Sequence, residues 1–183
     1  MLIEHCVEKF TGLVDQLYII DPGNAKPTRF ESIAFAFRFV HPCDNVIIAE
    51  AAVPNTSREK IERMIEALMF HNFVALVGPC KWTSCSLENG ELDGVYNREG
   101  MMEQHTPEAM RYGTLARIVK QCTPEEGFSM FYCAVKIHTA YIGLIEDEPD
   151  NIKVTYPHDL YAFEGILKAK EGAGHGRLHI PQR

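Results

Sequence analysis

Arg38 and Glu50 are the residues whose type and spacing point most directly to chemistry. Each interrupts a segment that is otherwise apolar or small, 32–40 and 46–53, and both segments have the composition of β-strands. If a symmetric turn joins the two strands, Arg38 and Glu50 lie diagonally on one face of a hairpin, about 7–8 Å apart at Cα. A guanidinium binds anionic groups and a carboxylate can transfer protons. The spacing therefore predicts a site in which Arg38 binds an anion and Glu50 acts as an acid or base.

Small residues line the face that is predicted to carry these two charges: Ser32, Ala34, Ala36 and Ala52. Small side chains around a charged pair leave room for a ligand, and the ligand we expect is a small anionic metabolite. The alternative is a structural ion pair on a sheet face, which has no role in chemistry. The sequence alone leaves both interpretations open.

Three polar residues share the even positions of the segment 128–145, which we interpret as one bent strand or two strands: Tyr132, Lys136 and His138. Alternate residues of a strand face the same side. Histidine is the side chain most often used for proton transfer, so His138 is a second candidate acid or base. Lys136 and Tyr132 are candidate ligand-binding residues beside it. The alternative is a solvated strand face.

Cys80 is a candidate nucleophile, because it follows an apolar strand and precedes Lys81, whose charge favours the thiolate. A catalytic cysteine also needs a histidine base nearby, and the sequence leaves several histidines open for that role. Cys85 differs from Cys80 by an odd number of positions, so in a regular strand the two thiols face opposite sides and cannot share a metal ion. The alternative is that Cys80 is an inert, packed side chain.

Two other pairs have metal-binding types, His41 with Cys43 and His175 with His179. Neither pair is accompanied by two more ligands at a spacing that zinc sites use, so we predict no metal site. The glycines of segment 172–183 do not follow a strand and open a helix, as a dinucleotide-binding loop requires. We therefore expect no cofactor.

Periodicity and turn signals predict the elements that must position these residues. Asn89-Gly90 predicts a hairpin with arms at 82–88 and 91–96, because a type I′ turn needs positive φ at both central residues. The order of elements predicts an α+β fold, in which three to four helices pack on a mostly antiparallel sheet. Besides the segments above, we predict strands at 73–78 and 152–156, and helices at 3–17, 56–69, 106–122 and 158–170.

The length of 183 residues predicts one domain, residues 1–171, followed by a glycine-rich tail, 172–183. A net charge of −7 has the wrong sign for a nucleic-acid-binding protein. No apolar run reaches the about 20 residues of a membrane-spanning helix, and the first residues lack the pattern of a signal peptide. Six cysteines without such a signal are expected to be reduced thiols, so we predict a cytoplasmic protein.

Two functions agree with these observations. The first is a domain that binds a small anionic metabolite and, if it is an enzyme, transforms it by acid–base chemistry at Glu50, His138 or Cys80. The second is a non-enzymatic interaction or assembly protein, accessory or viral, that binds a protein partner. A homo-oligomer is compatible with either function.

Overall fold

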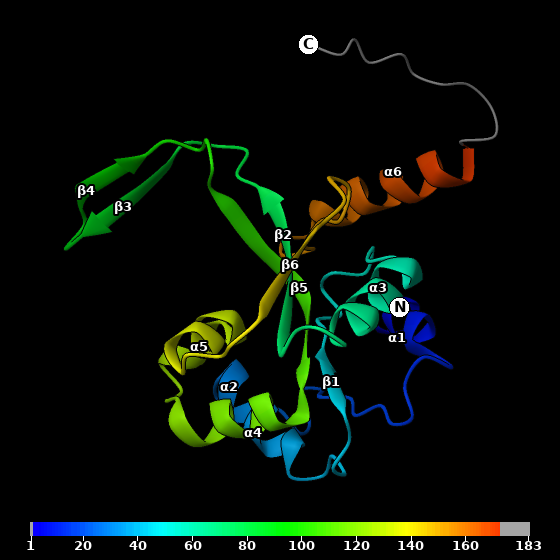
Figure 1. Cartoon of the computed structure of the whole chain (residues 1–183). Coiled ribbons are helices and arrows are strands. Elements are labelled where there is room, and N and C mark those ends of the chain that lie inside the picture. Colours follow the sequence, from blue (N-terminus) through cyan, green and yellow to red (C-terminus); the bar gives the residue numbers. More distant parts are fainter. Residues whose placement is uncertain (1, 173–183) are drawn as a thin grey trace.

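The structure is a computed structural model that describes residues 2–172, and its centre is a four-stranded sheet (Figure 1). The strand order is β1-β5-β2-β6, with β5 antiparallel to both neighbours and β6 parallel to β2. The strands are β1 (Asn45–Ile48), β2 (Phe73–Pro79), β5 (Met102–Arg111) and β6 (Ile142–Glu146). The sheet is therefore mixed, and β1, β2 and β6 all run in one direction.

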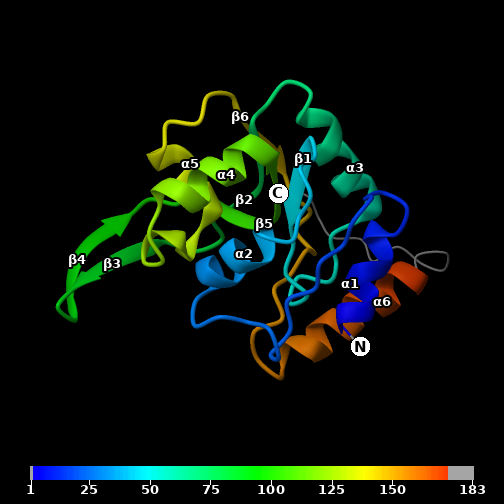
Figure 2. The same ribbon diagram turned by 90° about the horizontal axis from the view of Figure 1, so that it is seen from below.

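Six α-helices are formed within residues 2–172, more than the three to four predicted, and they cover both faces of this sheet (Figure 2). Phe73 and Ala75 of β2 pack with helices on one side, and the alternate residues Val74 and Leu76 pack with a helix on the other. The first face is covered by α2 (Arg29–Phe37), α4 (Tyr112–Gln121) and α5 (Met130–Lys136), and the second by α3 (Arg58–Ala67). This layering is typical of an α/β fold.

Two helices from opposite ends of the chain lie together beyond α3 (Figure 2). They are α1 (Leu2–Phe10) and α6 (Asp159–Gly172), and the rings of His5 and Phe163 meet edge-on at 5.8 Å. The helix predicted at 158–170 is confirmed, whereas the helix predicted at 3–17 ends at Phe10. Except for Gly172, the predicted tail lies outside the described residues.

The hairpin predicted around Asn89-Gly90 is confirmed and projects from the body (Figure 1). Its strands are β3 (Ser84–Glu88) and β4 (Glu91–Tyr96), and φ is 53° at Asn89 and 85° at Gly90. The predicted strand at 73–78 is also confirmed. The predicted helix at 56–69 is confirmed as α3, with Ser57 as its N-cap: the Ser57 hydroxyl accepts a hydrogen bond from the Lys60 amide at 3.2 Å.

The predicted strand at 32–40 is wrong, because these residues belong to α2 and the turn after it. Thr28 and Glu31 form a capping box that starts this helix, in which each side chain accepts a hydrogen bond from the other residue's amide. Helical spacing then buries Phe30, Ile33 and Ala36 on one face. The predicted hairpin of 32–40 with 46–53 therefore does not exist, and only Asn45–Ile48 of the second segment is a strand.

The helix predicted at 106–122 is confirmed only from Tyr112 to Gln121, as α4, and its predicted start is wrong, because Thr106 and Pro107 lie inside β5. Ala75 pairs with Glu108 and Leu76 with His105, so Thr106 and Pro107 have no partner on β2 and form a bulge. The peptide bond between these two residues is cis. A Thr-Pro pair is typical of a helix start, but it also suits a bulge, where proline's missing N–H leaves no ladder bond unmade.

The prediction of one bent strand or two strands at 128–145 is wrong for residues 128–141 and is confirmed only at the end of the segment. Ser129 caps α5, its hydroxyl accepting a hydrogen bond from the Tyr132 amide at 3.1 Å, and only 142–146 is extended as β6. The segment 152–156 forms no strand. Within residues 2–172 no helix is long and apolar enough to cross a membrane.

The packing of α3 on the sheet can be tested by removing a methionine side chain. Met64 is fully buried against Val74 and Leu76, so Met64→Ala should lower the free energy of unfolding by about 2–5 kcal/mol in urea denaturation. Met69, 73% exposed just after the same helix, provides the matched control: Met69→Ala should change it by less than about 0.5 kcal/mol. Equal effects of the two substitutions would show that α3 packs differently.

Candidate functional site

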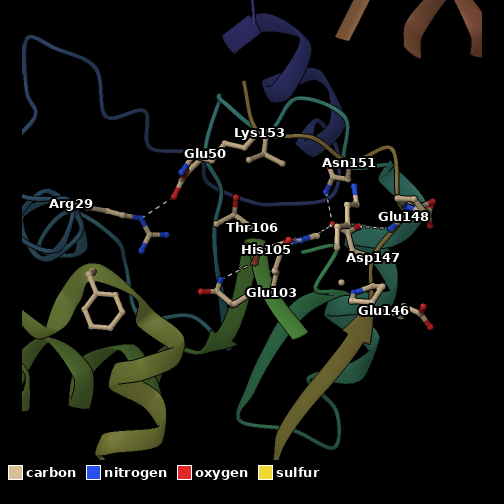
Figure 3. Close-up of a pocket in the computed structure, with 17 residues that line it drawn as sticks. Arg29, Glu50, Glu103, His105, Thr106, Glu146, Asp147, Glu148, Asn151 and Lys153 are labelled. Carbon is tan, nitrogen blue, oxygen red and sulfur yellow. Dashed lines mark hydrogen bonds and ion pairs between the residues drawn. The ribbon is translucent and has the colours of Figure 1, made fainter. Parts of the chain in front are cut away.

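A pocket of about 460 Å³ opens where the parallel strands β1, β2 and β6 end (Figure 3). In sheets with parallel strands, ligands bind in the crevice outside the carboxyl ends of those strands. Gly78 and Pro79 come from the end of β2, and Glu50 and Val53 follow β1. Strand β5 contributes Glu103, Gln104, His105 and Thr106, and the segment after β6 contributes Asp147, Glu148, Asn151 and Lys153. The pocket is therefore the best candidate for a functional site.

Glu50 lies in the wall of this pocket between two cations (Figure 3). Its Oε1 atom is 3.1 Å from Nε of Arg29, and its Oε2 atom is 2.7 Å from Nζ of Lys153. The predicted pair of Glu50 with Arg38 is wrong, because Arg38 is the C-cap of α2 and lies outside the pocket lining. Arg29, at the other end of the same helix, forms the ion pair with Glu50 that the sequence suggested for Arg38.

Arg29 connects the pocket to a buried acid in the core. Its Nη2 atom lies 3.0 Å from Oε2 of Glu108, which is fully buried on β5. The other oxygen of Glu108 accepts hydrogen bonds from the Phe131 amide at 3.0 Å and from Gln104 at 3.3 Å. Burial raises the pKa of Glu108, and the charge and hydrogen bond of Arg29 oppose that rise.

A histidine–aspartate pair forms the opposite side of the pocket (Figure 3). Nδ1 of His105 is 2.8 Å from Oδ2 of Asp147, whose carboxylate also accepts hydrogen bonds from Asn151 at 2.7 Å and from the Glu148 amide at 2.9 Å. The hydrogen bond to Asp147 raises the pKa of His105. Burial would raise the pKa of Asp147, but these hydrogen bonds together hold it below its usual value.

The hydroxyl group of Thr106 lines the pocket between Glu50 and His105 in the view of Figure 3. Its oxygen is buried and has no hydrogen-bond partner among the residues that the structure describes. A buried polar group without a partner is costly, and a ligand group that enters beside Thr106 would satisfy this hydroxyl.

The other predicted site residues, all inside the described range, do not line the pocket. Tyr132 and Lys136 belong to α5, where Lys136 pairs with Glu126 and the Tyr132 ring packs against Phe128 at 5.0 Å. His138 follows the same helix with φ of 51°. Because this segment is helical, the three do not share one strand face as predicted.

Cys80 lies just beyond β2, beside the pocket residues Pro79 and Lys81. Within the described part of the chain its sulfur makes no hydrogen bond, so the histidine base that a nucleophile needs is not in contact with it. A catalytic role for Cys80 stays a prediction. No group of three or more His, Cys, Asp or Glu within residues 2–172 is placed to hold a metal ion.

Sequence reasoning missed Arg29, His105, Asp147 and Lys153. Arg29 directly follows the capping threonine of α2, so recognition of the Thr28-x-x-Glu31 pattern would have placed it at a helix start. His105 precedes a bulge whose Thr-Pro pair is also typical of a helix start. The segment from Glu146 to Lys153 has the composition of an acidic cluster and the start of a strand, although it forms one wall of the pocket.

Comparison with known proteins identifies the family. The family model described as IspD, 2-C-methyl-D-erythritol 4-phosphate cytidylyltransferase, matches residues 4–169. The chain belongs to the IspD family. In agreement, the fold of the IspD-family structure from Thermus thermophilus superposes with a TM-score of 0.76 at 22% identity, covering 92% of this chain and 89% of that one. The structure from Francisella tularensis gives a TM-score of 0.77 at 19% identity, over 90% and 87% of the two chains.

Two relatives of this IspD-family chain have names that state different polyol phosphates. The 2-C-methyl-D-erythritol 4-phosphate cytidylyltransferase of Bacillus licheniformis is 28% identical over 156 residues, 84% of this chain and 66% of that protein. The D-ribitol-5-phosphate cytidylyltransferase of Xenopus tropicalis is 28% identical over 127 residues, 67% of this chain and 31% of that protein. The chain thus spans about two thirds or less of these curated relatives. IspD membership agrees with the expected small-molecule class and not with the alternative of an assembly protein.

The link between Arg29 and Glu108 predicts a specific pH dependence of stability. Without the guanidinium, the folded-state pKa of the buried Glu108 rises further above the unfolded value of about 4.3. Between those two values the folded state holds a proton that the unfolded state does not, so stability falls as the pH rises through the folded pKa. Arg29→Met should therefore lose about 3–5 kcal/mol at neutral pH and regain part of it near about pH 5.

Chemical denaturation at several pH values measures this effect. Arg63 is exposed on α3 and makes no ion pair with the described residues, so Arg63→Met should keep the wild-type pH profile. An Arg29→Met protein with the wild-type profile would show that Arg29 does not compensate Glu108.

Proposed function

We propose that this chain is a cytidylyltransferase whose pocket binds the acceptor, a phosphorylated polyol. The relatives from Bacillus licheniformis and Xenopus tropicalis are both named as cytidylyltransferases of polyol phosphates. The observation that carries the proposal is the Glu50 carboxylate held between Arg29 and Lys153, next to the unpartnered Thr106 hydroxyl. A polyol phosphate offers both kinds of group that this wall can bind, hydroxyls for the carboxylate and a phosphate for the cations.

In the proposed reaction one P–O bond forms and another P–O bond breaks. An anionic phosphate oxygen of the acceptor attacks the α-phosphorus of CTP and forms a new P–O bond. The bond from that phosphorus to the oxygen bridging the α- and β-phosphates breaks, and pyrophosphate leaves with the electron pair. Because the protein does little covalent chemistry in such a transfer, its contribution is to position the reactants and to stabilise the developing charge.

The side chains of the pocket can supply this positioning. Lys153 is 58% exposed, so its ammonium group can reach a phosphate while Glu50 holds it on one side. The attacking phosphate oxygen already carries charge and needs no base. We therefore propose that Glu50 orients Lys153 and accepts hydrogen bonds from acceptor hydroxyls, in place of the acid–base role predicted from the sequence.

Removal of the Lys153 charge tests the proposal. With CTP and either D-ribitol 5-phosphate or 2-C-methyl-D-erythritol 4-phosphate, the chain should release pyrophosphate, and Lys153→Met should lower kcat/KM by roughly 10- to 100-fold, since it removes a charge-assisted hydrogen bond. Lys168, exposed on α6 and outside the pocket, provides the matched control, and Lys168→Met should retain full activity. Absence of pyrophosphate release with both acceptors would contradict the proposed function.

Neutralising Glu50 should affect acceptor and nucleotide differently. Glu50→Gln keeps the shape of the side chain but loses both ion pairs, so the KM for the acceptor should rise about 10-fold while the KM for CTP stays within about 2-fold. Steady-state kinetics with each substrate varied in turn measures both values. The exposed Glu164 of α6 serves as the control through Glu164→Gln. An equal rise in both KM values would place Glu50 outside the acceptor site.

A further inference from the structure

The pair of His105 and Asp147 has a geometry that the proposed function does not yet use. Asp147 is 2% exposed, and three donors fix its two oxygens: Nδ1 of His105, the Asn151 amide group and the Glu148 backbone N–H. The aspartate therefore holds the imidazole ring in one orientation. The second ring nitrogen, Nε2, is 3.9 Å from the nearest carboxylate oxygen, that of Glu103, which is beyond hydrogen-bond distance.

A glycine of β2 makes the room for this ring. A Cβ atom at Gly78 would lie 2.7 Å from Cε1 and 3.2 Å from Nε2 of His105, closer than side chains pack without a shift. The ring therefore lies directly on the backbone of Gly78, and both residues line the pocket. Any side chain at position 78 would push the imidazole from its place.

On the basis of the proposed function, we infer that His105 is a further substrate-contacting residue, which donates a hydrogen bond from Nε2–H to an anionic oxygen of the phosphorylated acceptor. Asp147 is the positioning residue that accepts from Nδ1–H and keeps Nε2 directed at the pocket. Only the doubly protonated imidazolium can donate from both nitrogens at once, so this contact requires the positive charge of His105.

The charges around His105 agree with an anionic ligand. Three charged side chains act on its ring: Asp147, Glu103 and Lys81. The hydrogen bond to Asp147 raises the pKa of His105, which favours the imidazolium near neutral pH. Among the described residues no carboxylate is within ion-pair distance of the Lys81 ammonium group, so Lys81 and His105 together offer two cations to a phosphate.

Besides Asp147, three acids line this side of the pocket: Glu103, Glu146 and Glu148. Glu148 is paired with Lys60 at 2.8 Å, and Glu103 is half exposed, with 51% of its side chain accessible. Glu103 can therefore turn toward solvent when a phosphate takes its place near Nε2.

Titration calorimetry with D-ribitol 5-phosphate and with 2-C-methyl-D-erythritol 4-phosphate, between about pH 5.5 and 9, tests the inference. Affinity should first rise as the phosphate loses its second proton, with a pKa of about 6, and then fall as His105 loses its charge. His105→Gln should bind the acceptor roughly 10- to 100-fold more weakly near neutral pH and should lack the falling limb. His41→Gln, a substitution at an exposed histidine outside the pocket, should leave both the affinity and the profile unchanged.

Two more variants separate the contact from a structural effect. Asp147→Asn keeps the size of the side chain but lowers the pKa of His105, so the falling limb should move to lower pH, and the His105 Cε1 proton in NMR spectra should titrate at the same lower pH. Gly78→Ala should displace the ring and weaken acceptor binding by a similar factor to His105→Gln, although it changes no charge.

The outcomes distinguish this inference from the proposed function. If the wild-type chain releases pyrophosphate and binds an acceptor, but His105→Gln binds it equally well with the same pH profile, the role of His105 is wrong and the proposed function stands. If the wild-type chain binds neither acceptor and releases no pyrophosphate, both are wrong.

Discussion

Glu108 is a fully buried acid on β5, and the way its charge is compensated determines how the helices meet the sheet. Arg29 at the start of α2 and the Phe131 amide in α5 both bind its carboxylate, so two helices are anchored to one strand residue. A buried carboxylate that loses its partner destabilises a fold by several kcal/mol, so Arg29 has to stay in place. Because the same guanidinium also holds Glu50, a requirement of the core fixes the position of a charge in the pocket.

The bulge on β5 extends this constraint to the opposite side of the pocket. Glu108 and His105 pair with neighbouring residues of β2, and the two unpaired residues between them bring the Thr106 hydroxyl to the pocket lining. A short segment of one strand thus carries the core anchor, an unpartnered hydroxyl and the histidine that meets Asp147. Bulges are frequent beside functional sites for this reason, since they redirect side chains without ending the strand.

Local signals predicted some elements correctly and long-range contacts decided the others. Asn89-Gly90 needs only its own backbone to form a turn, and Ser57 needs only the next turn of α3 to cap it, so both could be recognised in the sequence. In 32–40 the alternating phenylalanines imitate a strand, whereas the capping box at Thr28 and the burial of Phe30 and Ile33 produce a helix. The cap at Thr28 lies outside the nine residues that alternate, so the alternation by itself could not reveal the helix.

Glu50 could be recognised in the sequence, because a charged residue in an apolar segment is conspicuous. Its two ion-pair partners could not be recognised there. Arg29 and Lys153 reach Glu50 from distant parts of the chain. Strands β1 and β6 lie at opposite edges of the sheet, and the segments that follow them meet across it, where the Val154 amide also donates to the Ala52 carbonyl at 2.7 Å. These ion pairs also determine which ligands the pocket can bind. Arg29 and Lys153 are both paired with the pocket acid Glu50 before a ligand arrives, so these cations are held in position and little reorganisation is needed on binding. Glu148, another pocket acid, is paired with Lys60, which does not line the pocket. A simple anion would meet these acids as repulsive neighbours, whereas a ligand with hydroxyl groups can donate to them, and this favours a polyol phosphate over inorganic phosphate.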